Sequence, residues 1–305
     1  MLHCPGDGRR RDDVVTLLAG ALAVLAALLF AIASVAQRGA AADVPDEEAR
    51  GGRLIARLVR SPRWWAGTVG DTGGFVVQAA ALGLGALLLV QPLLVTTVLF
   101  ALPLEARLTG RRIGRAEVVW AGVLVAALAL FVVVGEPAAG ADRAPLRTWA
   151  PSLVVLLALV AACVLLAGRR RGPRRAAMLA VATGLVYGLV AALTKSVVDA
   201  LGDGPVALLT SWETWALVAA VAGGTFLQQT AFGAGPLAAS LPAVTVGEPV
   251  VAAVLGVVVL SEQVRADGVE WGLIAVLVAL MIAATAALSR SSAAATPAPV
   301  PVEVP

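Results

Sequence analysis

The chain has 305 residues, of which 59% are hydrophobic and 14% are charged. This balance excludes an ordinary soluble domain, because too few polar residues remain to cover its surface, and it predicts a membrane protein. We do not interpret the net charge of +3 as nucleic-acid binding, because arginine sorts between the two sides of a membrane. One histidine and two cysteines offer no metal-ligand spacing and no disulfide framework, so no cofactor is expected.

A helix needs about 20 apolar residues to cross the hydrocarbon core of a bilayer. Nine runs reach or approach this length, which predicts an all-α polytopic membrane protein with nine transmembrane helices. In chain order the runs are 14–36, 64–84, 86–104, 118–134, 151–167, 176–198, 212–232, 237–260 and 271–288. Residues 1–13 form an amino-terminal tail, and the Pro-rich composition of residues 290–305 predicts a disordered tail.

The first run has an alternative interpretation as a signal peptide. Three arginines precede it, and Ser34-Val35-Ala36 resembles a cleavage site. The apolar core of a signal peptide has only about 7 to 15 residues, however, and this run is longer. It also has a counterpart in the sixth run, where Tyr187 and Lys195 recur at the spacing of Phe30 and Arg38. We therefore favour a transmembrane helix.

Basic residues are unevenly distributed among the connections. Sixteen, Arg290 included, lie in alternate connections and so on one side of the membrane, and six lie on the other side. Since Arg and Lys are retained in the cytoplasm, the amino terminus is predicted to lie outside the cytoplasmic membrane and the carboxyl terminus inside.

Shifting the chain against itself by 150 residues shows an internal repeat. The eight identities are Gly73, Gly74, Gln78, Ala81, Gly83, Gly85, Leu87 and Pro92 with Gly223, Gly224, Gln228, Ala231, Gly233, Gly235, Leu237 and Pro242. Five predicted spans separate Gln78 from Gln228, so equivalent helices run in opposite directions. The first repeat is 14–134, a connector with the fifth helix is 135–175, and the second repeat is 176–289. The offset between the two copies then changes, because Glu105 and Glu262, which each end an apolar run, are 157 residues apart.

Inverted repeats are typical of secondary transporters, in which two similar bundles make the inward-open and outward-open states nearly equal in energy. The predicted function is therefore movement of a small solute or cation across the lipid bilayer. The alternative is that duplication produced a stable bundle that transports nothing.

Polar residues at bilayer depth are candidates for a substrate or ion pathway, because their burial in lipid is costly. Glu248 lies between two prolines in the eighth run, where freed carbonyls could join its carboxylate in binding a cation; the alternative is a protonated glutamate hydrogen-bonded to another helix. Asp71 shares a helix face with Gln78, but could instead pair with an arginine of the first loop. Asp71 and Glu248 are the metal candidates. The remaining pathway candidates are neutral: Gln91, Gln228 and Gln229.

Other charged residues are expected near the membrane surface. Lys195 and Asp199 are one turn apart and predict an interfacial ion pair. Glu105, Glu213 and Glu262 end or begin runs and are expected at the surface. No Ser/His dyad, metal motif or phosphate-binding loop is present, so an enzyme is not expected.

Several short motifs resemble the first repeat of the drug/metabolite transporter superfamily, which includes the EamA-like proteins: Gln37-Arg38-Gly39, Arg63-Trp64-Trp65-Ala66-Gly67, Gly83-Leu84-Gly85-Ala86, Val90-Gln91-Pro92-Leu93 and Leu104-Glu105. Residues 236–262 resemble its second repeat. The resemblance implies a carrier that works by alternating access. Nine spans with an external amino terminus are similar to the NIPA-type magnesium transporter branch, which makes Mg²⁺ an alternative cargo to a small metabolite or drug. A homodimer is left open.

Overall fold

The computed structural model describes residues 6–42, 60–110, 112–234, 237–266 and 268–294, without the side chains of 6–13, 37–42, 63, 109, 233, 237–239 and 292–294. The chain divides into two compact units, Met1–Arg115 and Ala116–Pro305. The regular structure of the described residues is helical in both, apart from one short two-stranded ladder. Of the two predicted tails, 1–13 and 290–305, residues 6–13 belong to α1 and residues 290–294 to α12, and the rest lies outside the described residues.

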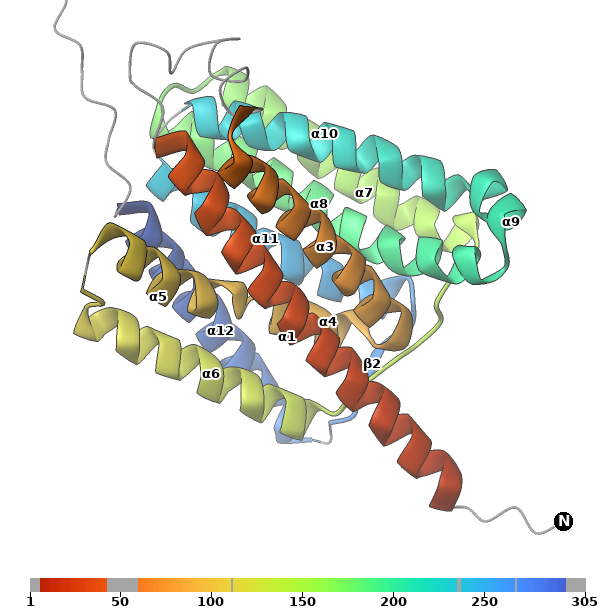
Figure 1. The fold of residues 1–305 in the computed structure, drawn as a ribbon. Coiled ribbons are helices and arrows are strands. Elements are labelled where there is room, and N and C mark those ends of the chain that lie inside the picture. Colours follow the sequence, from red (N-terminus) through yellow and green to blue (C-terminus); the bar gives the residue numbers. More distant parts are fainter. Residues whose placement is uncertain (1–5, 43–59, 111, 235–236, 267, 295–305) are drawn as a thin grey trace, which may run out of the picture. The chain divides into compact units, whose positions relative to one another are not determined.

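The described residues of the first unit form four helices: α1 (Gly6–Ala42), α3 (Pro62–Leu84), α4 (Leu87–Leu94) and α5 (Thr97–Thr109). Helix α1 packs against each of the other three (Figure 1). Its buried face is made of small residues, mainly alanines such as Ala23, Ala27 and Ala31. Small side chains let neighbouring helix backbones approach closely, which is the usual basis of helix association in a membrane.

Local sequence fixes the ends of α3 and divides the next span. Ser61 caps α3 and Pro62 occupies its first turn, where a missing backbone N–H costs nothing. Helices α4 and α5 together form one apolar run, Leu87–Leu108, which is interrupted at Val95 and Thr96. The hydroxyls of Thr96 and Thr97 donate to backbone carbonyls one turn earlier, at 2.6 and 2.7 Å, and so satisfy groups at the break.

The second unit is built around α8. Its helices are α6 (Arg115–Gly135), α7 (Leu146–Gly168), α8 (Pro173–Gly202), α9 (Pro205–Thr210), α10 (Trp212–Ala234), α11 (Leu237–Val258) and α12 (Glu270–Ala294). Helix α8 is buried along most of its length and contacts α7, α10 and α11 (Figure 1). Helix α12 packs against α11 and, through Ile274 and Leu277, against Ala127 and Phe131 of α6.

Two loops of the second unit cross at one end of its helices. Strands β1 (Pro137–Ala138) and β2 (Gln263–Val264) form an antiparallel pair that joins the α6–α7 loop to the α11–α12 loop. At Gly140 the first loop passes so close to the second that an added Cβ would overlap the Leu260 carbonyl oxygen. This crossing holds the residues that follow Gly140 near the end of α8.

Seven helices in the described part of the chain are long and apolar enough to cross a membrane, which indicates a multi-pass membrane protein. They match seven of the nine predicted runs, with Leu87–Leu108 counted as one. The remaining two runs form α3 and α10, each a helix of 23 residues. Both contain polar residues among the apolar ones, so length and composition alone do not identify them as membrane spans.

Candidate functional site

Three of the six residues predicted to line a pathway lie in the first unit. Asp71 and Gln78 share α3, and the structure exposes Asp71 but buries Gln78. Gln91 on α4 is 1% exposed, and its Nε2 has no hydrogen-bond partner among the described residues. A buried amide without an acceptor is costly, and such groups are commonly satisfied by water or a ligand.

The other three predicted residues lie in the second unit. Gln228 on α10 is half-buried, and its Oε1 accepts a hydrogen bond of 3.0 Å from the Tyr187 hydroxyl on α8. Gln229 is exposed. Gln228 therefore bridges two helices, which is the common use of a membrane glutamine, while its amide nitrogen remains a donor for other groups.

Glu248 lies where α11 crosses α8. A Cβ added to Gly184 would lie 3.0 Å from the Cα of Gly247, and one added to Gly188 would lie 2.9 Å from the carbonyl oxygen of Glu248. The two helix backbones meet at this distance because both α8 positions lack a side chain. The Glu248 side chain is half-buried beside this crossing.

Helix α11 continues through both prolines that flank Glu248. Thr245 lies one turn before Glu248, and its hydroxyl is 3.0 Å from that of Ser289 on α12. It also lies 3.0 Å from the Leu241 carbonyl. Pro249 has no N–H to bond the Thr245 carbonyl, so within one turn α11 carries a carboxylate, the Thr245 hydroxyl and a carbonyl that lacks its helical donor, and α12 adds the Ser289 hydroxyl. Groups of this kind can bind a cation or a polar solute.

The same helix contact occurs once in each unit. In the first, the Phe30 ring of α1 lies over Gly74 of α3, and a Cβ added there would be 2.8 Å from the ring. In the second, the Tyr187 ring of α8 lies over Gly224 of α10, at a corresponding 2.7 Å. Gln78 and Gln228 each follow the glycine by one turn. The pairs that the sequence repeat matches thus make matching contacts.

A charged network occupies the end of the second unit where the loops cross. Lys195 of α8 is 1% exposed, and its Nζ lies 2.9 Å from Oε1 of Glu262, which is also 1% exposed. A carboxylate oxygen of Asp142, in the α6–α7 loop, is 3.6 Å from the same nitrogen. The Ser196 hydroxyl donates to the Asp142 backbone carbonyl at 3.2 Å. Lys195 and Ser196 thus tie α8 to both loops.

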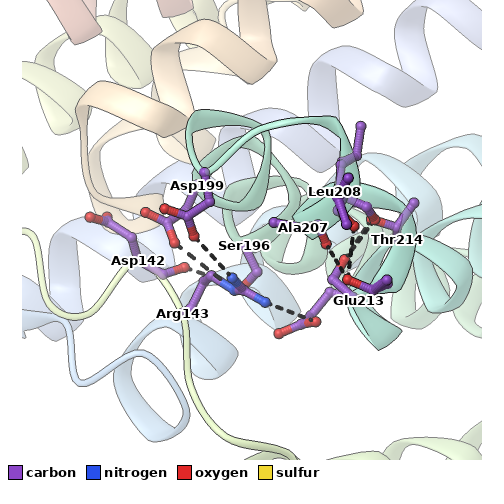
Figure 2. A network of polar contacts seen from close by, with 12 residues as sticks. Asp142, Arg143, Ser196, Asp199, Ala207, Leu208, Glu213 and Thr214 are labelled. Atoms are coloured by element: carbon purple, nitrogen blue, oxygen red, sulfur yellow. Dashed lines mark hydrogen bonds and ion pairs between the residues drawn. The ribbon is translucent and has the colours of Figure 1, made fainter.

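Arg143 extends the network to α10. Its guanidinium lies 3.9 Å from Asp199 and 3.5 Å from Glu213 (Figure 2). It also lies 3.6 Å from Asp203. Glu213 is 2% exposed, whereas the two aspartates are open to solvent. Together, the two cations of the network face five carboxylates, and they join three connections at one end of the unit.

These contacts correct two expectations from the sequence. Glu105, Glu213 and Glu262 are buried and not at the surface, with exposed fractions of 8%, 2% and 1%. Lys195 pairs with Glu262 and Asp142, while Asp199 pairs with Arg143, so the expected Lys195–Asp199 pair is wrong. The end of an apolar run predicts a surface position for a charged residue, but the loops that meet at the end of α8 bury Lys195, Glu213 and Glu262 in the second unit. The sequence held one signal of this meeting. The alternation of the predicted spans places the α6–α7, α8–α10 and α11–α12 connections on the same side of the membrane.

Among the described residues, no group of three or more His, Cys, Asp or Glu side chains could hold a metal ion. Asp71 and Glu248, the two metal candidates, lie in different units. A divalent cation bound at either would therefore depend on backbone carbonyls, amides or retained waters for its remaining ligands.

A protein of Corynebacterium glutamicum described as uncharacterized is 37% identical to the chain over 275 residues, which is 90% of this chain and 95% of that protein. The chain belongs to the family of this protein. No family model and no solved structure matches the chain. The matched length of 275 residues includes parts of both compact units.

Proposed function

We propose that the chain is a secondary transporter that moves a small metabolite, drug or cation by alternating access between two inverted repeats. The observation that carries the proposal is the recurrence of one helix contact, Phe30 on Gly74 and Tyr187 on Gly224. Two copies of one packing arrangement can exchange conformations at little cost in energy, which is the physical basis of alternating access.

The proposal requires nine spans, so α3 and α10 must also cross the membrane. Helix α10 follows α8 in the opposite direction: Glu213 contacts Arg143 near the end of α8, Gly224 meets Tyr187 midway, and Ala231 packs with Leu179 near its beginning. Its 23 residues extend about 34 Å at 1.5 Å per residue. This exceeds the hydrocarbon thickness of about 30 Å.

The distribution of arginine supports an external amino terminus and a cytoplasmic carboxyl terminus. Arg169, Arg170 and Arg171 lie in the α7–α8 connection, at the opposite end of α8 from the charged network. Basic residues are retained in the cytoplasm. The network of Lys195 and Arg143 accordingly faces outward in a cytoplasmic membrane.

Glu248 and the neighbouring hydroxyls favour a polar or cationic organic solute over a dehydrated divalent ion. A divalent ion needs several oxygen ligands, and the described residues bring few carboxylates together at bilayer depth. The resemblance to the drug/metabolite transporter superfamily agrees with such a cargo. Hydrated Mg²⁺ remains the alternative, because magnesium usually keeps several of its waters.

Flux measurements in proteoliposomes test the proposal. The purified chain is reconstituted, and uptake and efflux of Mg²⁺ are compared with those of a panel of amino acids and cationic drugs. We expect flux of one class, and a loss of at least about tenfold in Glu248→Gln, which corresponds to about 1.4 kcal/mol.

The matched control is Glu270→Gln, which removes an exposed carboxylate at the start of α12 and should leave flux unchanged. Unchanged flux in Glu248→Gln would remove that residue from the mechanism. If neither Mg²⁺ nor any panel compound crosses with the wild-type chain, the bundle has a structural role.

A further inference from the structure

A cavity of about 610 Å³ lies beside the crossing of the two loops in the second unit. This volume is in the range of small-ligand pockets, about 300 to 1,000 Å³. Its walls are the last turn of α6 with the residue that follows it, residues 263–266, and the start of α12. None of these residues belongs to the crossing of α8 and α11 where Glu248 lies. The cavity is therefore separate from the residues assigned to transport.

Two opposite charges on the cavity wall lie in register with each other but do not pair. The β1–β2 ladder pairs Pro137 with Val264. One position further, Glu136 lies opposite Arg265, and the Arg265 backbone N–H donates to the Gly135 carbonyl at 2.9 Å. The φ angle of Glu136 is 35°, so the chain leaves the extended conformation of a strand at this residue. In the part of the chain that the structure describes, neither charged side chain has a hydrogen bond or an ion pair.

We propose that this cavity binds a zwitterionic amino acid with an apolar side chain. The Arg265 guanidinium donates to the ligand carboxylate, for which its planar fork is suited, and the Glu136 carboxylate accepts from the ligand ammonium. An amino acid carries both charges on one carbon atom, so a single small ligand compensates both side chains. Glu270 also lines the cavity, but it has an interaction of its own, and we assign no ligand contact to it.

The remaining wall of the cavity is apolar. Val134, Val264 and Ala266 are partly buried and pack against the hydrophobic cluster between α6 and α12, which holds them in place. Val133 also lines the cavity and is 72% exposed. A ligand side chain that covers these groups removes apolar surface from water. The wall therefore favours an amino acid such as leucine over one with a polar side chain.

A bound amino acid joins the two loops, because Glu136 belongs to the α6–α7 loop and Arg265 to the α11–α12 loop. It therefore stabilises the crossing that holds Asp142 and Arg143 at the end of α8. The inference goes beyond the proposed function and does not rest on it, since every group that it uses lies in the second unit.

Calorimetric titration of the purified full-length chain in detergent, near neutral pH, tests the inference with three probes. L-leucine carries both charges, L-leucinamide lacks the carboxylate, and N-acetyl-L-leucine lacks the ammonium. We expect L-leucine to bind about tenfold more tightly than either of the others, because each of them loses one set of charged hydrogen bonds.

Two variants assign each ligand charge to its partner. Arg265→Gln should weaken L-leucine binding about tenfold and leave L-leucinamide binding unchanged, because this probe has no carboxylate to lose. Glu136→Gln should weaken L-leucine binding and leave N-acetyl-L-leucine binding unchanged. Both side chains are exposed, so neither variant removes a buried contact. The matched control is Arg147→Gln, which removes an exposed guanidinium outside the cavity wall and should bind L-leucine as the parent does.

Three results would overturn the inference: no binding of L-leucine, equal binding of all three probes, or an equal loss of L-leucine and L-leucinamide in Arg265→Gln. Glu248→Gln separates this site from the proposed transport site. Loss of L-leucine binding in Glu248→Gln but not in Arg265→Gln would place the ligand at α11, which contradicts the inference and favours the carrier. Binding that survives in Glu248→Gln and weakens in Arg265→Gln supports the inference, whether or not any compound crosses the membrane.

Discussion

Two glycines set how closely the paired helices of each unit approach. The aromatic ring on α1 or α8 occupies the space that a side chain would fill at Gly74 or Gly224. The adjacent residues, Gly73 and Gly223, have nothing within 4 Å of an added Cβ. Glycine is thus required by packing at one position of each Gly-Gly pair and not at the other.

Gly224→Ala should destabilise the protein, because its methyl group would overlap the Tyr187 ring. Overpacking of a well-packed contact costs about 1 to 3 kcal/mol, more than the 0.5 to 1 kcal/mol that alanine gains over glycine in a helix. Gly223→Ala is the matched control, because it gains the helix preference of alanine without an overlap. Thermal unfolding in detergent should show a lower midpoint for Gly224→Ala and an equal or higher one for Gly223→Ala. Equal midpoints for both variants would contradict the ring contact.

The sequence identified Gln228 as an unusual polar residue but not its partner. Tyr187 lies 41 residues earlier, and only the packing of α8 on α10 brings the two together. The surface positions predicted for Lys195 and Glu262 were wrong for a related reason. A charge near the end of an apolar run predicts a surface position by itself, whereas three converging loops remove water from that end.

At the scale of elements, the nine predicted runs correspond to helical segments, and their boundaries differ most at the ends. The run 86–104 forms two helices with a break at Val95–Thr96. Its second-repeat counterpart, α11, continues through Pro242 and Pro249. Proline does not by itself decide whether a membrane helix breaks, because side-chain hydroxyls and neighbouring helices can satisfy the freed backbone groups. The composition of the two runs therefore could not predict that one breaks and the other continues.

The crossing of the α6–α7 and α11–α12 loops is the element that positions the charged network. Besides the β1–β2 pair, the Ala141 N–H donates to the Leu260 carbonyl at 2.6 Å. Glu136 and Ser261, at the edges of the crossing, have positive φ angles of 35° and 56°. Residues other than glycine rarely adopt this conformation, so surrounding contacts must compensate the strain.

Gly140→Ala should disrupt this crossing, because the added methyl group would overlap the Leu260 carbonyl. The loops would separate, and Asp142 and Arg143 would move away from Lys195 and Glu213. We expect a loss of about 1 to 3 kcal/mol in the free energy of unfolding. Thermal unfolding in detergent measures it, with Gly122→Ala as the control, since nothing lies within 4 Å of a Cβ added there. An unchanged midpoint for Gly140→Ala would show that the loops do not cross so closely.

At the scale of the whole molecule, the sequence repeat and the compact units divide the chain at different residues. The repeat places 118–134 in the first copy, whereas contacts place α6 in the second unit. Packing against α12 explains the difference, together with a hydrogen bond that Ser291 donates to Glu117. The repeat is defined by sequence similarity, whereas the compact units are defined by which helices pack together.

The number of spans decides the relative direction of the two copies. With nine spans, three precede the α5–α6 connection and eight precede the α11–α12 connection, so the two connections lie on opposite sides. If α3 and α10 did not cross, two and six spans would precede them, and both would lie on the same side. The repeats would then be parallel, and the argument for alternating access between inverted copies would fail.

Cysteine labelling at these two connections is the most direct test. Ile113→Cys and Val269→Cys, at positions 40% and 91% exposed, are made separately in the Cys4→Ser, Cys163→Ser background. Intact cells are treated with a membrane-impermeant maleimide before and after permeabilisation. The inverted repeat predicts that Val269→Cys reacts in intact cells and that Ile113→Cys reacts only after permeabilisation. Labelling of both in intact cells, or of neither, would contradict it.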